Sequence, residues 1–188
     1  MTTIQTSDRY EDIESDDIGR PELLDGFIEA CQELYPNMRY NGYFVDGDDK
    51  SLFDHNIDFD EDFVYPGGAH IWIYPHESDY RDVIDFAYSV AMKNCRTTIL
   101  MQLIPGTFPW SYALRYAREI IFLQESPACD QSYGWALVTL GPMVKMPSIR
   151  RNEITMVSEW NWKTRKMQVA GVFVKTEIQP IHFGFNEQ

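Results

Sequence analysis

The chain has 188 residues, of which 44% are hydrophobic, and a formal net charge of −13. This length suits one domain with a sizeable core of its own. Its three cysteines are far apart and form no CxxC pair, which argues against a disulfide framework or a zinc cluster. No apolar run approaches the ~20 residues of a membrane-spanning helix, so we expect a soluble protein in a reducing compartment.

The negative charge is concentrated in the first third of the chain. Residues 1–65 hold 18 acidic and 4 basic side chains, whereas residues 66–188 hold 11 and 12. An acidic surface repels the phosphates of nucleic acids and favours a basic partner. The alternative is that this charge only keeps the protein soluble.

The first 68 residues predict an arm, a helix, a strand and a connection. Residues 1–20 are polar and without periodicity, which indicates an acidic, flexible arm. An apolar stripe with a proline at its start predicts a helix over 21–35. The stretch YNGYFVDG, residues 40–47, predicts a strand that closes on a turn, and residues 48–68 then read as an acidic connection.

After Gly68 the pattern alternates between strand and helix. Period-2 or buried apolar runs alternate with amphipathic ones, which predicts strands at 70–74, 97–104 and 119–123 and helices at 79–95 and 109–117. This βαβαβ order favours parallel strands with right-handed crossovers. A further strand is expected at 134–141.

The last part of the chain changes character. Two β-rich runs, 153–162 and 167–175, flank the polar turn KTRK and predict an antiparallel hairpin. Trp160 and Trp162 lie in the first run beside basic residues, so they either bind single-stranded nucleic acid or a protein, or pack into the core. We expect one α/β domain over 21–188.

In open α/β sheets, ligands bind outside the carboxyl ends of the strands. Three such ends deserve comparison, VDGDD at 45–49, YPHES at 74–78 and IPGTFPW at 104–110. His76 and Glu77 in the second could form an acid/base pair, although no partner nucleophile is recognisable. His70 is about 20 Å from His76 along an extended strand, too far for both to bind one metal ion.

Residues 21 to about 140 resemble the phage-type DNA N6-adenine methyltransferases. The similar segments are the helix PELLDGFIEACQELY, the strand HIWIY with the following helix, and the strands REIIFLQ and GWALVTLG. The best local match is a strand ending Leu-Leu-Pro, then a threonine and a tryptophan, which corresponds here to Leu103, Ile104, Pro105, Thr107 and Trp110.

The resemblance implies a Rossmann-like, methyltransferase-type sheet, S-adenosylmethionine as cofactor, and a phage protein in the cytoplasm of a host cell. In this family an Asn-Pro-Pro-Tyr loop holds the flipped adenine through its first residue, its backbone and its final aromatic ring. The matching positions here are Tyr74, Pro75, His76 and Glu77. A phenol replaces the amide, and a carboxylate replaces the ring that stacks on the base. The catalytic loop is thus degenerate.

Three residues are candidates for cofactor binding. Asp46 follows a predicted strand and either holds a ribose hydroxyl or serves as a turn residue. Thr107 and Trp110 are assigned to the cofactor side by the resemblance alone. No GxG loop lies near a strand-to-helix junction, and S-adenosylmethionine binding is either retained or lost.

The segment DFDEDF supplies a candidate partner-binding surface. Asp58, Asp60, Glu61 and Asp62 alternate with or adjoin phenylalanines, so an extended segment would present charge on one face. Spaced carboxylates of this kind imitate the phosphates that a DNA-binding protein recognises. The alternative is a solvated acidic loop.

The leading hypothesis is a catalytically degenerate, methyltransferase-like phage protein that binds a basic host or viral protein, for example one that acts on DNA. An alternative is an active S-adenosylmethionine-dependent DNA adenine methyltransferase with an altered loop, and only this alternative makes DNA a partner. A third is a virion or assembly component. The sequence does not indicate the oligomeric state.

Overall fold

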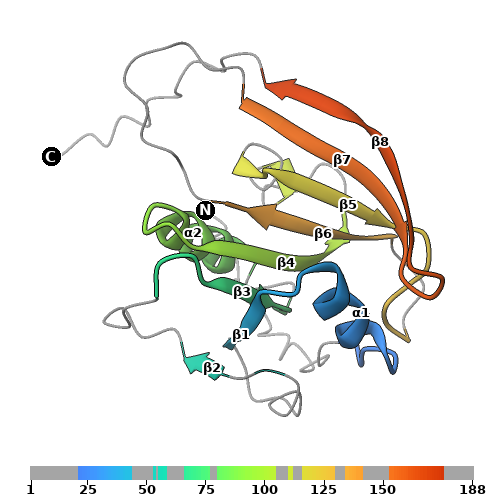
Figure 1. The fold of residues 1–188 in the computed structure, drawn as a ribbon, viewed down its shortest axis with the longest axis horizontal. Coiled ribbons are helices and arrows are strands. Elements are labelled where there is room, and N and C mark those ends of the chain that lie inside the picture. The colour runs from blue at the N-terminus through green and yellow to red at the C-terminus, as the bar shows by residue number, and fades with distance from the viewer. Residues whose placement is uncertain are drawn as a thin grey trace, which may run out of the picture.

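The computed structural model describes residues 21–43, 53, 55–58, 66–76, 80–104, 110–111, 116–129, 134–141 and 153–175. They form a mixed α/β structure around one eight-stranded sheet (Figure 1). The strands are β1 (Met38–Tyr43), β2 (His55–Asp58), β3 (His70–Ile73), β4 (Arg96–Leu103), β5 (Glu119–Leu123), β6 (Gly134–Leu140), β7 (Glu153–Asn161) and β8 (Lys166–Lys175).

The strand order across the sheet is β2-β1-β3-β4-β6-β5-β7-β8. β2, β1, β3 and β4 are parallel to one another, and β6 runs antiparallel between β4 and β5. The three strands predicted from the βαβαβ order, β3, β4 and β5, thus run in the same direction, and β6 lies between β4 and β5. β7 pairs parallel to β5 and antiparallel to β8, which gives the expected C-terminal hairpin.

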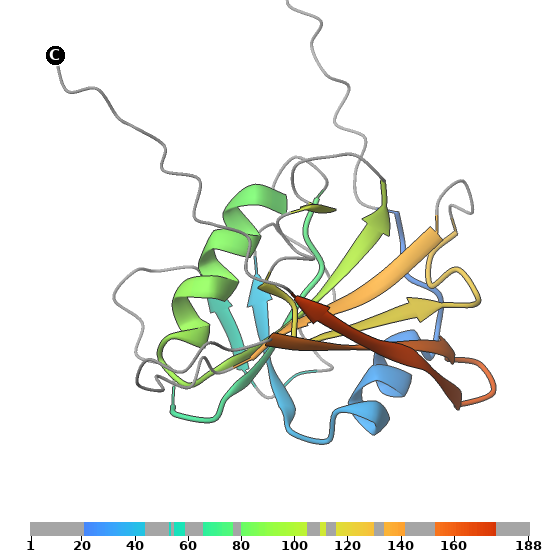
Figure 2. The ribbon, with the colours of Figure 1, turned by 90° about the horizontal axis from the view of Figure 1, so that it is seen from above.

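The two described helices cover opposite faces of the sheet (Figure 2). α2 (Tyr80–Ala91) buries Val83, Ile84, Ala87 and Val90 against one face. α1 (Phe27–Leu34) buries Phe27, Ala30 and Cys31 on the other, which we call the α1 face. Its core is unusually aromatic, and three of its tryptophans have at most 2% of their surface exposed: Trp72, Trp135 and Trp160.

α1 is shorter than the predicted helix over 21–35. It begins at Phe27 because Gly26 adopts a left-handed conformation, with φ of 79°, that ends any continuous helix through this point. The residues before Gly26 instead pair with the segment around Ala128, through an antiparallel bridge from Leu23. The Leu24 amide donates to the Pro127 carbonyl over 2.8 Å.

A second prediction is wrong in part, because the strand β2 lies within residues 48–68, which we predicted to be an acidic connection. Its four residues pair parallel to β1, from Tyr40 opposite His55 to Tyr43 opposite Asp58. A short run with three polar residues carries no clear strand signal, and only its neighbour β1 provides the hydrogen bonds that define it. The arm predicted for residues 1–20 lies outside the described residues and stays a prediction.

The tip of the β7-β8 hairpin is fastened to the α1 face. Trp160 and Trp162 are 2% and 5% exposed and belong to the core, so they are not available to stack on bases. The Trp162 ring meets Phe27 edge-on at 5.4 Å between centroids. Next to it, Arg165 forms an exposed ion pair with Glu33 of α1 at 2.8 Å.

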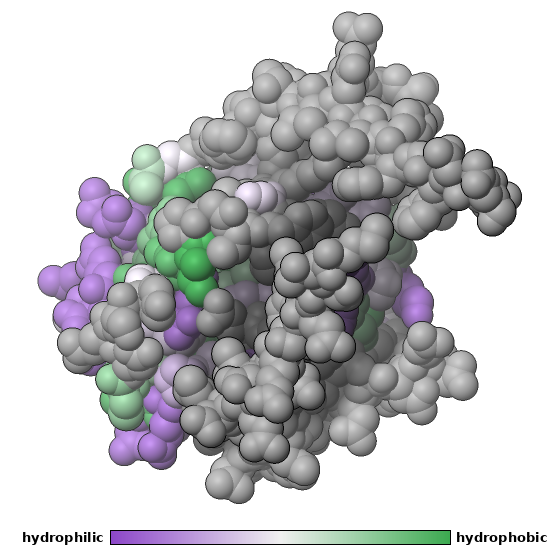
Figure 3. Space-filling model, turned by 180° about the vertical axis from the view of Figure 1, so that it is seen from behind, coloured by the Kyte–Doolittle hydropathy of each residue, from purple (hydrophilic) through white to green (hydrophobic). Residues whose placement is uncertain are grey.

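The described surface is mainly polar. Four large apolar side chains are exposed among the described residues: Met92, Met156, Met167 and Val169. On the face opposite to Figure 1, hydrophilic side chains gather along one side, next to a smaller hydrophobic area (Figure 3). Neither described helix is long and apolar enough to cross a membrane.

Candidate functional site

The side of the sheet on which successive strands are added changes at β1. From β1 the chain adds β2 on one side and then β3, followed by β4, on the other. Parallel sheets bind ligands at such a switch point, in the crevice outside the carboxyl ends of the two central strands. Here those ends are Tyr43 of β1 and Ile73 of β3. The carboxyl edge at β1 and β3 is thus the candidate site.

The fold directs the three predicted strand ends to this one edge, since β1, β3 and β4 are parallel. Tyr43 ends β1, Ile73 ends β3 and Leu103 ends β4 at this edge. Asp46, Glu77 and Thr107 themselves lie outside the described residues, so their roles stay predictions.

Tyr74 is the first residue of the loop that follows β3, and its side chain belongs to the core. It is 8% exposed, and its ring packs edge-on against Trp135 at 6.1 Å between centroids. Its hydroxyl donates a 2.7 Å hydrogen bond to the carbonyl of Pro21. The phenol is therefore already used to hold the segment before α1.

The other described loop residues differ in exposure. Pro75 is buried, whereas His76 is half-buried just beyond the end of β3. Of the residues assigned to the cofactor, Trp110 is half-buried and packs against the α2-side core, with its ring 6.5 Å from that of Phe122. This contact gives Trp110 a structural role.

The proposed partner-binding residues are only partly described. Asp58 ends β2, where its backbone pairs with Tyr43. Asp60, Glu61 and Asp62 lie outside the described residues. A basic partner for this acidic segment stays a prediction.

A chain of polar side chains crosses the α1 face near the opposite edge of the sheet. His70 Nε2 lies 2.8 Å from Thr98 Oγ1, which lies 2.9 Å from Thr139 Oγ1. Thr139 is 3.4 Å from the Tyr35 hydroxyl, and that hydroxyl donates to Glu119 Oε2 over 2.7 Å. We call these five residues the polar chain.

The hydrogens of the polar chain can be assigned from its end. Tyr35 has one hydroxyl hydrogen and gives it to the Glu119 carboxylate, so Thr139 must donate to Tyr35. By the same count Thr98 donates to Thr139, and His70 Nε2–H donates to Thr98. All donors thus point toward Glu119, and His70 carries its proton on Nε2.

Burial keeps the inner members of the polar chain neutral. Burial, and then the positive charge of Arg96, lower the pKa of His70 to about 3. Burial, followed by the negative charge of Glu119, raises the pKa of Tyr35 above its usual value near 10. Both side chains therefore act as neutral hydrogen-bonding groups near pH 7.

Sequence reasoning missed the polar chain. The sequence suggests His70 only as a metal ligand, and no motif marks the other four members: Tyr35, Thr98, Thr139 and Glu119. The sequence does contain one signal for the polar chain, namely the threonines within the otherwise apolar strands TTILMQLI and GWALVTLG. Buried hydroxyl groups need hydrogen-bond partners, so these threonines indicate a buried polar contact.

Comparisons with known proteins add little. No known family model matches the sequence, and no curated protein matches it. Among solved structures, the chain is similar to the methyltransferase subunit of a type I restriction-modification system from Streptococcus thermophilus, with 16% identity and a TM-score of 0.34. The similarity covers 57% of this chain and 30% of that subunit. A TM-score this low carries no argument about function.

Two neighbouring threonines of β4 should respond oppositely to the same substitution. Among described residues, Thr97 Oγ1 is buried without a hydrogen-bond partner, whereas Thr98 Oγ1 contacts both His70 and Thr139. Thr97→Val should raise the free energy of unfolding by about 1 kcal/mol, and Thr98→Val should lower it by about 1–3 kcal/mol because it leaves His70 unpaired. Urea denaturation measures both. Two changes of equal sign and size would contradict the polar chain.

The neutral state of His70 predicts a pH dependence of stability. Below pH about 6.5 the unfolded chain takes up a proton at this residue, while the folded chain, with a pKa of about 3, does not. Stability should therefore fall as the pH drops from 6.5 toward 3, by about 2 kcal/mol between pH 7 and pH 5. His70→Gln keeps a donor for Thr98 and should flatten this slope in urea titrations at several pH values. Equal slopes in both proteins would refute the assignment.

Proposed function

We propose that this chain is a methyltransferase-like protein with a Rossmann-like sheet that acts by binding, without the amino-methylation that the family resemblance implies. The observation that carries this proposal is the use of Tyr74. Its hydroxyl is bound to the Pro21 carbonyl and its ring is packed on Trp135. With only 8% of its surface exposed and both its ring and its hydroxyl held in the core, Tyr74 does not present its hydroxyl to an adenine amino group.

The sheet order supports a retained ligand crevice. β2-β1-β3-β4 is a parallel unit with its switch point at β1, where nucleotide-like ligands bind in open α/β sheets. S-adenosylmethionine is the ligand that the resemblance suggests for this crevice, with Asp46, Thr107 and Trp110 as its candidate contacts. In that case half-buried Trp110, held beside Phe122, would contact the cofactor from a fixed position.

The charge distribution supports a basic protein as partner, in a phage-encoded protein of the host cytoplasm. Of the net charge of −13, residues 1–65 account for −14. A surface of this charge attracts a basic partner over several ångströms and repels DNA. Asp58, Asp60, Glu61 and Asp62 are the proposed contacts.

We expect this protein to bind the cofactor without transferring its methyl group to DNA. Calorimetric titration with S-adenosylmethionine and S-adenosylhomocysteine tests the crevice, and tritiated S-adenosylmethionine with unmethylated duplex DNA tests transfer. We expect micromolar binding, about −8 kcal/mol, and no transfer above that of heat-denatured protein. Transfer to adenine would overturn the binding proposal. Absence of binding would remove the cofactor from it and leave protein recognition alone.

Tyr74→Phe is the matched variant for the same experiment. Removing the hydroxyl leaves the partly buried Pro21 carbonyl without this donor and should lower the free energy of unfolding by about 1 kcal/mol. Because the hydroxyl is structural in this proposal, cofactor binding should not change.

One observation favours the alternative of an active enzyme. His76 is half-buried beyond the end of β3, beside the switch point, where a general base would stand. If transfer is found, His76→Ala and Glu77→Gln should abolish it without unfolding the protein.

Partner binding should depend on the acidic segment. A variant with Asp58, Asp60, Glu61 and Asp62 changed to lysine should lose a basic protein captured from host lysate by the wild type, and capture should weaken with added salt. The matched control changes four exposed acids elsewhere to lysine: Glu22, Glu29, Asp82 and Asp85. Equal capture by both variants would refute the role of residues 58–62.

A further inference from the structure

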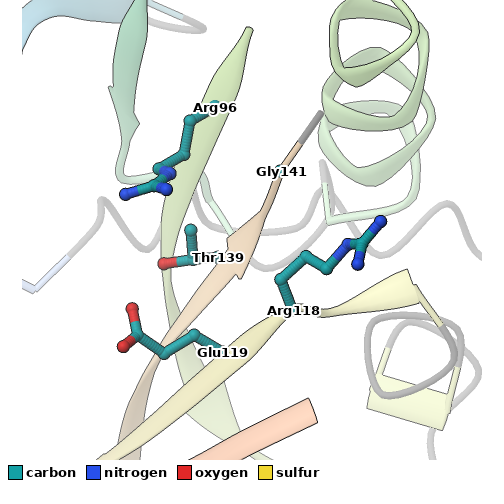
Figure 4. A pocket seen from close by; sticks show the side chains of 5 residues that line it. All are labelled: Arg96, Arg118, Glu119, Thr139 and Gly141. Atoms are coloured by element: carbon teal, nitrogen blue, oxygen red, sulfur yellow. The ribbon is translucent and has the colours of Figure 1, made fainter. Parts of the chain in front are cut away.

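A polar pocket opens at the sheet edge opposite to the candidate site. It has a volume of about 320 Å³ and is lined by Arg96, Arg118, Glu119, Thr139 and Gly141 (Figure 4). These residues come from the starts of β4 and β5 and from the end of β6, which meet at one edge because β6 runs in the opposite direction. The volume is at the lower end of the range for small-molecule sites, about 300–1,000 Å³.

Arg96 and Glu119 stand on the α1 face with Thr139 between them (Figure 4). Their strands are separated by β6, and two strand spacings amount to about 10 Å. The two charges do not pair with each other. Among the described residues, the Arg96 guanidinium has no hydrogen bond or ion pair, whereas Glu119 has only the bond from Tyr35.

Glu119 is held in place by the polar chain. The 2.7 Å bond from Tyr35 has the length of a charge-assisted hydrogen bond to a carboxylate. It engages Oε2, and Oε1 has no hydrogen bond among the described residues. Thr139 adds a hydroxyl to the pocket wall, and its oxygen is itself fixed by Thr98 at 2.9 Å. A pocket with one cation, one oriented anion and a fixed hydroxyl is organised before any ligand arrives.

Arg118 lies in the same lining but does not share this arrangement. Its side chain extends toward the opposite face from Arg96 and Glu119 (Figure 4). Its stem passes close to Gly141, where an added Cβ would lie 3.3 Å from Arg118 Cγ. Arg118 thus closes the rim of the pocket with its apolar stem.

We propose that this pocket binds a small zwitterion, a molecule with an ammonium group and a carboxylate or phosphate group of the amino-acid class. Arg96 binds the anionic group through its planar donors, and Glu119 Oε1 accepts from the ammonium group. The presence of both charges in one pocket also provides selectivity for zwitterions. A ligand with only an anionic group meets the repulsion of Glu119, and a ligand with only an ammonium group meets that of Arg96.

The test is a calorimetric titration at low salt with glycine, 4-aminobutyrate and phosphoethanolamine as zwitterions, and with acetate, inorganic phosphate and ethylamine as singly charged probes. We expect binding of at least one zwitterion, at least about tenfold tighter than that of every singly charged probe. Equal binding of acetate or phosphate, or no binding of any zwitterion at millimolar concentration, would overturn the proposal.

Two variants and one control assign the residues. Arg96→Gln, at an exposed position, should weaken zwitterion binding about tenfold or more without affecting folding. Glu119→Gln should also weaken zwitterion binding about tenfold or more. In addition, it should abolish the discrimination against the anionic probes. Arg81→Gln, at an exposed arginine of α2 outside the pocket lining, is the matched control and should bind within about twofold of the wild type. If Arg96→Gln binds as the wild type does, or if Arg81→Gln loses binding to the same extent, the assignment is wrong.

Discussion

The placement of β6 between β4 and β5 is the constraint on which the rest of the structure depends. β6 pairs along its whole length with β4, from Gly134 opposite Leu103 to Leu140 opposite Thr97, and along most of it with β5. It joins the parallel unit β2-β1-β3-β4 to the group β5-β7-β8, and the two parts form one sheet only through it. The faces that α1 and α2 cover are continuous for the same reason.

Because β6 is antiparallel to its neighbours, it contributes to both edges of the sheet. Its first residues stand at the carboxyl edge of β4, where Trp135 packs on Tyr74 and holds the start of the loop after β3 in the core. Its last residues stand at the opposite edge, where Thr139 lies between Arg96 and Glu119. Aromatic packing thus fixes the carboxyl edge at β4, while the opposite edge keeps oriented charges around a pocket.

Periodicity in the sequence predicted β3, β4, β5, β6, α2 and the C-terminal hairpin, because each has a pattern that its own residues define. It did not predict which strands are neighbours, since β4 and β5 are separated by a strand that comes later in the chain. It extended α1 over Gly26, whose left-handed backbone depends on the contact of the preceding residues with Pro127. At the site, the strand ends were predicted, but the structural use of Tyr74 depends on Pro21, 53 residues away.

The polar chain supplies information that the apolar pattern of the central strands lacks. β4 and β6 are buried on both faces, with Leu100 and Leu137 on one and Ile99 and Val138 on the other. A one-residue slip between these strands would still bury apolar side chains, so hydrophobicity specifies their register weakly. The slip would, however, turn Thr139 away from Thr98 and leave buried hydroxyls unpaired, each at a cost of about 1–3 kcal/mol. The threonines therefore select the register, and the same register places Glu119 and Arg96 on either side of the pocket.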